Sequence, residues 1–339
     1  MDRTHYAPSS QAARHISMKI RELDLSENPI NTEHAELGLP PIEQVVTHPK
    51  ETLILRVSGW LVGLILLGAI TYLSFRLFTE NGSLDNVGSI VSDVLQSKIF
   101  WAAVLVGLAA QTIDGALGMA YGITCNTFLL LSGIPPATAT ASVHIAEVFT
   151  TGISGIAHLK MRNVDVRLFL RLLLPGITGA VLGAWFVTHI DGNFLKPYIS
   201  VYLLIMGIYL ISKIFHKHKV QNKEPKHVAK LALFGGFSDS VGGGGWGPIV
   251  TTTLIGSGHN PRMTIGSVNF TEFFLTFGSA IAFSILIDNN PWPIVAGLVF
   301  GGIFSAPLAA KITQKLQAKT LLLIVGVLIT FLSLVNLYK

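Results

Sequence analysis

Charge is scarce in this sequence. Only 13% of the 339 residues are charged and 50% are hydrophobic, with a mean hydropathy of +0.56. An average soluble domain carries about 25% charged residues, so the composition excludes an ordinary soluble globular protein. Several uncharged runs, among them 57–75 and 172–190, reach the length of about 20 residues that crosses a bilayer as a helix. The sequence therefore predicts an all-α polytopic membrane protein.

Cysteine is nearly absent, and the first part of the chain has no long apolar segment. Cys125 is the single cysteine, which excludes an intramolecular disulfide. Residues 1–50 are polar and lack the apolar region of a signal peptide. We therefore expect a polar cytoplasmic tail here.

The net charge of +5 does not indicate a nucleic-acid-binding protein. Lysine gathers in short segments, above all 213–230, which holds six Lys and one Glu. This pattern is typical of cytoplasmic loops between membrane spans, as the positive-inside rule describes. The basic residues therefore indicate topology, and nucleic acid is not an expected partner.

An internal repeat organises the rest of the chain. Residues 109–157 align without a gap on 234–282, with 16 identities in 49 positions. Asp114 falls on Asp239 and Glu147 on Glu272, which apolar composition alone does not explain. The chain therefore contains two copies of one unit, preceded by an extra first helix.

A glycine-rich stretch in each unit predicts a broken helix. The second copy reads "GGFSDSVGGGGWGP" (235–248), inside the apolar run 231–256 whose only charge is Asp239. Glycine costs about 1 kcal/mol per residue relative to alanine in a helix, so a plain lipid-facing helix is not expected. The first segment of unit one, 99–133, would be about 52 Å long as one helix. Each unit is predicted to be a broken or re-entrant helix pair followed by three spanning helices.

Basic residues predict that the two units are inverted. The segments 158–171, 213–230 and 311–319 are rich in Lys and Arg and are assigned to the cytoplasm, whereas 288–293 has no basic residue. Equivalent loops of the two copies then lie on opposite sides, which is the inverted-repeat organisation of secondary transporters. Arg76 lies at an end assigned to the outside and disagrees mildly. A parallel repeat, with first segments that cross once, is the alternative.

The predicted organisation has six parts. They are a cytoplasmic tail (1–55), an extra transmembrane helix (56–78), an extracytoplasmic loop (79–98), repeat 1 (99–213), a basic cytoplasmic loop (214–229) and repeat 2 (230–339). The expected location is the bacterial inner membrane, with several spans and a cytoplasmic N-terminus.

The repeated elements "DGALGMAYG" (114–122) and "DSVGGGGWGP" (239–248) resemble the signature of the sulfite exporter TauE/SafE family. The resemblance covers about residues 100–338. It implies a bacterial anion permease that carries sulfite, sulfoacetate or related organosulfonates. Unit one departs from the glycine-rich form at Ala116, Leu117, Met119 and Ala120, so the two halves need not contribute equally to a site.

The broken helices also supply the predicted binding site. Glycine lets backbone N–H groups approach a ligand, and the N-terminus of a half-helix favours an anion. The alternative is that the glycines only allow close helix packing. The candidate substrate-binding residues are Gly115, Gly118, Tyr121, Gly122, Thr124, Asn126, Gly242, Gly243, Gly244, Gly245, Trp246, Gly247, Thr251 and Asn269.

Acidic residues at membrane depth form a second candidate set. Asp114 and Asp239 are expected to cap the second half-helices rather than bind an anion. Glu147 and Glu272 have either a hydrogen-bonded structural role or a role in proton coupling. His144 lies three residues before Glu147, hence on the same helical face, and imidazole can exchange a proton near neutral pH.

Three other functions compete with anion transport. An intramembrane enzyme lacks support, because the His144-x-x-Glu147 pattern has no second histidine of a zincin helix; we expect no enzyme activity, cofactor or bound metal. The core carboxylates and His144 could instead ligate a transported cation. A non-transporting membrane scaffold is the third alternative. The expected partners are a small anion, the lipid bilayer and protons or another coupling ion, with the oligomeric state left open.

Overall fold

A computed structural model of the chain describes residues 49–79, 87–117, 119–215, 227–257, 259–287, 292–305 and 318–338. These residues are helices and short connections and contain no strand, which confirms the predicted all-α class. The chain divides into two compact units, Met1–Ile54 and Leu55–Lys339. The bundle described below belongs to the second unit. Among the described residues, four helices are long and apolar enough to cross a membrane: Leu53–Tyr72, Val166–His189, Gly192–Ser212 and Arg262–Leu286.

The extra first helix is α3 (Pro49–Thr79), which contains the predicted span 56–78. Its large apolar side chains, such as Trp60, Leu64 and Leu67, are more than 60% exposed. A soluble protein rarely exposes so continuous an apolar surface, so lipid is the natural environment of this helix. The interval 79–98, predicted to be a loop, contains the helix α4 (Val87–Gln96).

Repeat 1 consists of α5 (Lys98–Leu117), α6 (Tyr121–Leu131), α7 (Pro136–Lys160), α8 (Val166–His189) and α9 (Gly192–Ser212). A short 3-10 turn, Lys213–Phe215, follows. The helix ends have local causes. Pro136 occupies the first turn of α7, where a missing N–H costs nothing. The carboxylates of Asp165 and Asp191 accept backbone N–H bonds at the starts of α8 and α9, as N-caps do.

Repeat 2 has the same order of elements. They are α10 (Val228–Gly242), a π-helical turn (Gly247–Thr251) that continues into α11 (Thr252–Gly256), α12 (Pro261–Leu286), α13 (Trp292–Ile303) and α15 (Ala318–Tyr338). The first segment is therefore interrupted in both repeats, between α5 and α6 and between α10 and the π turn. These interruptions are where the glycine-rich stretches predicted them.

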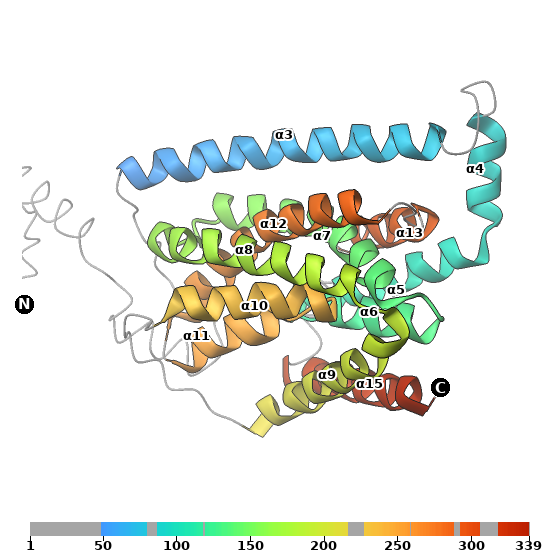
Figure 1. Cartoon of the computed structure of the whole chain (residues 1–339). Coiled ribbons are helices and arrows are strands. Elements are labelled where there is room, and N and C mark those ends of the chain that lie inside the picture. Colours follow the sequence, from blue (N-terminus) through green and yellow to red (C-terminus); the bar gives the residue numbers. More distant parts are fainter. Residues whose placement is uncertain are drawn as a thin grey trace, which may run out of the picture. The chain divides into compact units, whose positions relative to one another are not determined.

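The packing of the helices has a two-fold pattern. The two α7-type helices, α7 and α12, pack on each other, and so do α9 and α15. Helix α8 of repeat 1 packs along α10 of repeat 2, and its counterpart α13 packs along α5 (Figure 1). Exchanging the two repeats maps the α7–α12 and α9–α15 contacts onto themselves and the α8–α10 contact onto the α13–α5 contact. This is expected when two copies share one core.

Glycines bring α8 against α10, and α13 against α5, in backbone contact. A Cβ on Gly179 of α8 would lie 2.1 Å from the carbonyl oxygen of Leu233 in α10. At the counterpart crossing, a Cβ on Gly301 of α13 would lie 2.1 Å from the carbonyl oxygen of Val104 in α5. Small residues at membrane helix crossings allow this close approach. Packing and not flexibility explains the glycines at these two crossings.

The crossing of α8 and α10 gives a first prediction. We expect Gly179→Ala to lower the free energy of unfolding by about 1–3 kcal/mol, the range of an overpacked core, because the added methyl group meets a backbone carbonyl. Thermal unfolding of the detergent-solubilised protein measures the change. The matched control is Gly63→Ala in α3, where an added Cβ meets nothing within 4 Å, and which should be neutral or slightly stabilising. Equal stability of the two variants would contradict the packing argument.

Candidate functional site

The two interrupted helices meet backbone to backbone. Gly122 is the second residue of α6 in repeat 1, and Gly243 and Gly244 lie in the interruption of repeat 2. A Cβ on Gly122 would lie 2.6 Å from the carbonyl oxygen of Gly243, and one on Gly244 would lie 2.2 Å from the amide nitrogen of Ile123. Gly243 (φ +67°) and Gly244 (φ +148°) also adopt backbone conformations that L side chains rarely adopt. Close packing of the backbone therefore explains these three glycines, independently of any role in ligand binding.

An aspartate organises each turn. The Oδ1 atom of Asp239 accepts hydrogen bonds from the amides of Gly245 (2.6 Å) and Trp246 (2.9 Å). Its counterpart Asp114 accepts one longer bond, 3.3 Å, from the amide of Tyr121. Each aspartate belongs to the helix before the interruption, and the N-cap positions of the following helices are Ala120 and Trp246. The aspartates therefore bind amides near the start of the second half-helix from the preceding helix, and the capping role stays a prediction. Among the described residues, Asp239 accepts more of these bonds than Asp114.

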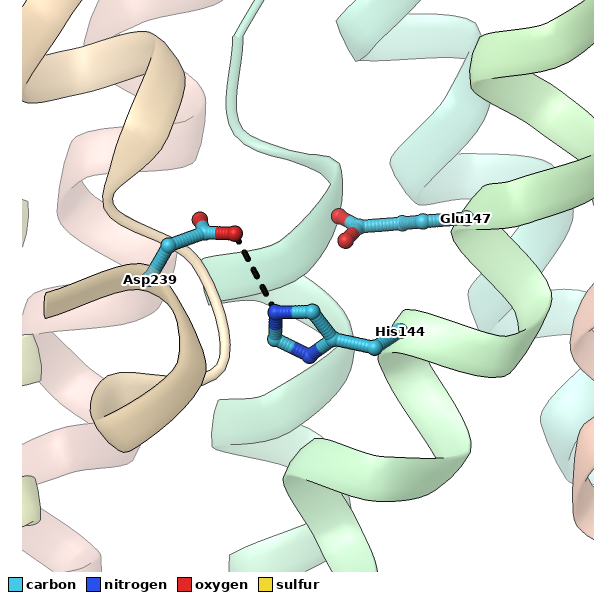
Figure 2. Close-up of side chains that lie close together, drawn as sticks. All are labelled: His144, Glu147 and Asp239. Carbon is cyan, nitrogen blue, oxygen red and sulfur yellow. Dashed lines mark hydrogen bonds and ion pairs between the residues drawn. The ribbon is translucent and has the colours of Figure 1, made fainter. Parts of the chain in front are cut away.

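His144 connects the two repeats. Its Nε2 atom lies 3.1 Å from Oδ2 of Asp239, and its Nδ1 atom lies 2.8 Å from the carbonyl oxygen of Thr140 (Figure 2). Both His144 and Asp239 are buried. The sequence suggested Glu147 as the functional neighbour of His144, but the hydrogen-bond partner is the capping aspartate of the other repeat.

The hydrogen bonds of His144 join the two repeats at the cavity. The carbonyl oxygen of Thr140 only accepts hydrogen bonds, so Nδ1 of His144 donates to it. The other ring nitrogen, Nε2, is then directed at Oδ2 of Asp239. A side chain of α7 in repeat 1 therefore contacts the aspartate at the turn of repeat 2.

Four carboxyl groups share one small cavity at the two turns. The cavity has a volume of about 10 Å³, which is about the space that the centre of one water molecule occupies. Its acidic lining residues are Asp114, Glu147, Asp239 and Glu272. Each repeat thus contributes one Asp from its turn and one Glu from the following helix. Ionised carboxylates this close disfavour one another, so the cavity favours protons or a cation.

Glu147 is a carboxylate with spare hydrogen-bonding capacity among the described residues. It is 3% exposed, and its Oε2 atom has no hydrogen-bond partner among the described residues. Figure 2 shows its carboxylate directed toward the space beside Asp239 and His144. One ligating atom from each of these three residues lies within 4.8 Å of the others. The cluster can hold a proton or a small cation.

The predicted binding residues divide into two groups. The cavity is lined by Tyr121, Gly122, Gly244, Gly245 and Gly247. The lining residues do not include Gly242, Gly243, Thr124, Asn126, Trp246, Thr251 or Asn269. Gly115 belongs to α5, and Gly118 lies outside the described residues. Trp246, expected to offer its indole N–H to a ligand, donates it to the carbonyl oxygen of Val268.

Several predicted polar residues are buried beside the turns with unused atoms. Asn126 donates from its amide nitrogen to the carbonyl oxygen of Gly242 (2.6 Å), which joins α6 to the end of α10. Its Oδ1 atom and Oγ1 of Thr124 are buried without a partner among the described residues. Asn269 is the counterpart of His144. Among the described residues, its Oδ1 atom has no hydrogen-bond partner and its side chain makes no hydrogen bond to Asp114. The symmetric sequence positions therefore differ in chemistry.

Tyr202 and Lys213 of the α9 segment are two residues that sequence reasoning missed. The hydroxyl of Tyr202 donates to the carbonyl oxygen of Gly244 (3.2 Å), and a Cβ on Gly242 would lie 2.2 Å from its ring. Tyr202 also lines a separate apolar cavity of about 510 Å³ between α8, α9 and α10. Lys213 turns back to contact both repeats. Only the packing of α9 reveals either role, because both lie far from the repeated motif.

These features define a class of protein: a polytopic helical membrane protein whose paired broken helices enclose a buried polar cavity. The chain belongs to the sulfite exporter TauE/SafE family, whose pattern matches residues 103–336. It is therefore a membrane transporter.

Three relatives are consistent with this assignment. The probable membrane transporter protein YtnM of Bacillus subtilis (strain 168) is 42% identical over 241 residues, which cover 68% of this chain and 79% of the relative. YunE of the same organism, also described as a probable membrane transporter protein, is 21% identical over 71% of this chain and 98% of its own length. ORF9 of Sinorhizobium sp, also described as a probable membrane transporter protein, is 28% identical over 55% of this chain and 75% of its own length. No solved structure matches the chain.

The unequal caps give a second prediction. We expect Asp239→Ala to lower the free energy of unfolding by about 0.5–2 kcal/mol or more, the range typical of a lost N-cap. The substitution frees two amides and also leaves His144 without its partner. Asp114→Ala removes one long hydrogen bond and should cost about 0.5 kcal/mol, the low end of that range. Thermal unfolding in detergent compares them. A greater loss for Asp114→Ala would show that the cap of repeat 2 does not hold the turn.

Proposed function

We propose that the protein is a secondary transporter for small sulfur-containing oxyanions, such as sulfite, sulfoacetate or related organosulfonates. The observation that carries the proposal is the convergence of two broken-helix turns on one buried cavity. Backbone amides at such turns can bind an anion. The description of the family, sulfite exporter, supports the substrate class. We propose no enzymatic reaction.

The size of the cavity supports alternating access. A volume of about 10 Å³ accommodates one water and no sulfur oxyanion. The contact between Gly122 and Gly244 closes the site from within. Substrate binding therefore requires the two turns to move apart, and this movement would open the cavity toward one side of the membrane at a time.

The carboxyl groups make proton coupling part of the proposal. An oxyanion among ionised carboxylates is repelled, whereas a protonated carboxyl group donates a hydrogen bond to it. Among the described residues, Glu147 has an oxygen without a hydrogen-bond partner beside the hydrogen-bonded His144 and Asp239. It is the group best placed to bring in a proton with the anion. Each anion entering with protons would also limit the charge carried into the buried site.

The proposed topology is an inverted repeat in the bacterial inner membrane, with a cytoplasmic N-terminus and the sequence boundaries given above. The two-fold packing of α5, α8, α10 and α13 supports a symmetric pair of repeats. The Lys- and Arg-rich segments at 158–171 and 213–230 support opposite orientations.

A cation transporter is the second candidate, because a specific observation favours it. His144, Glu147 and Asp239 present one ligating atom each within 4.8 Å, and carboxylate oxygen and imidazole nitrogen are ordinary cation ligands. Such a cation would be cargo or a coupling ion.

Electrical recording separates the two candidates. The purified protein in proteoliposomes on a solid-supported membrane should give substrate-dependent current with sulfite or an organosulfonate, and the current should change with the imposed pH gradient. Divalent metal salts should give none above empty liposomes. Current with metal ions but not with sulfur oxyanions would favour the cation transporter, and no current with either class would overturn both.

Glu147 provides the test of coupling. We expect Glu147→Gln to abolish pH-driven accumulation of the anion in proteoliposomes, because glutamine keeps the shape but cannot exchange a proton. The matched control is Glu272→Gln, whose neighbour at the position of His144 is Asn269 and which should retain part of the pH-driven flux. Unchanged flux in a well-folded Glu147→Gln protein would end the coupling proposal.

A further inference from the structure

A lysine ammonium group lies against the interrupted segments of both repeats. Lys213 directly follows α9, and its side chain is partly buried. Its Nζ atom donates to Oγ1 of Thr252 at 2.8 Å and approaches Sδ of Met119 at 3.3 Å. Met119 lies in the interruption between α5 and α6, and Thr252 begins α11 after the π turn. One cation thus joins the two elements that form the central cavity.

The contacts of Lys213 leave its charge without an opposite charge. A hydroxyl oxygen is a neutral acceptor and a thioether sulfur is a weak one, while an ammonium group has three donors. Among the described residues no carboxylate pairs with it. Burial lowers the pKa of Lys213 to about 8, so the group is still mostly charged at pH 7. A partly buried charge without a partner is costly, and an anion would remove this cost.

Lys213 is also close to the cavity along both chains. Met119 directly precedes Ala120 and Tyr121, which line the cavity. Thr252 lies four residues after Pro248, another lining residue, which is about one helical turn. An anion held by the ammonium group would therefore lie beside segments that line the cavity. In the part of the chain that the structure describes, Lys213 contacts the interruption of repeat 1 at Met119 and the start of α11 at Thr252.

We propose that Lys213 is an anion-binding residue of the transport route, which holds a sulfite or sulfonate oxygen next to the two turns before the anion enters the carboxyl-lined cavity. This inference rests on the proposed anion transport. The ammonium group exchanges its weak contact with Met119 for a charge-assisted hydrogen bond to the anion. Release from Met119 would at the same time free the interruption of repeat 1 from the contact that ties it to α9.

Three variants test this role. Lys213→Gln removes the charge and keeps a donor for Thr252, and Lys213→Arg keeps the charge. Thr252→Val removes the hydroxyl partner and keeps the ammonium group. The matched control is Lys230→Gln, since Lys230 is an exposed lysine near the same basic segment. Each variant is purified, checked for its unfolding temperature, and assayed for the KM of sulfite or organosulfonate uptake in proteoliposomes at pH 7.

We expect Lys213→Gln to raise KM about tenfold or more, the effect of losing one charge-assisted hydrogen bond. Lys213→Arg, Thr252→Val and Lys230→Gln should stay close to the unsubstituted protein. If Lys213→Gln does not fold, Thr252→Val decides. A tenfold rise of KM in Thr252→Val, which keeps the ammonium group, would assign Lys213 a structural role and overturn the proposal. An unchanged KM in Thr252→Val would support it.

The two proposals fail in different ways. Anion uptake by the unsubstituted protein together with an unchanged KM in a folded Lys213→Gln variant would overturn the role of Lys213 and leave the proposed function standing. No uptake of any sulfur oxyanion by the unsubstituted protein would overturn both.

Discussion

The contact between two interrupted helices is the constraint on which the site depends. Gly122 and Gly244 bring backbone against backbone in the centre of the bundle, where an uncapped helix end would leave amides unpaired at membrane depth. Each repeat therefore needs a carboxylate at its turn, and close contact places both carboxylates in one cavity. The crowding of acidic groups is thus a consequence of joining two capped helix ends.

His144 supports one of the two aspartates. Its hydrogen bond to Asp239 spans the two repeats. Among the described residues Asp114 has no such partner and accepts one longer bond, from Tyr121. A carboxylate with fewer hydrogen bonds is costlier to keep ionised in a buried site. The two turns are therefore alike in backbone arrangement and unlike in the hydrogen bonds that their aspartates accept.

The sequence predicted the helix breaks because glycine and a capping aspartate act through local backbone chemistry. It also predicted the repeat, since Asp114 and Asp239 align in register. It did not predict that His144 pairs with Asp239, because helical spacing ranks neighbours only within one helix. Lys213 was grouped with a basic loop, and Trp246 with the ligand site, because neither charge nor aromaticity reveals which way a side chain turns in the packed bundle.

The difference between His144 and Asn269 has a consequence for a repeat transporter. Two identical inverted halves would give inward-facing and outward-facing states of equal free energy, because exchanging the halves exchanges the states. A hydrogen bond that forms in only one half removes this equality. With the proposed inversion, the hydrogen bond between His144 and Asp239 would stabilise one state over the other. Asn269 makes no such bond to Asp114 among the described residues, so the opposite turn lacks this contribution and the two states would differ in free energy.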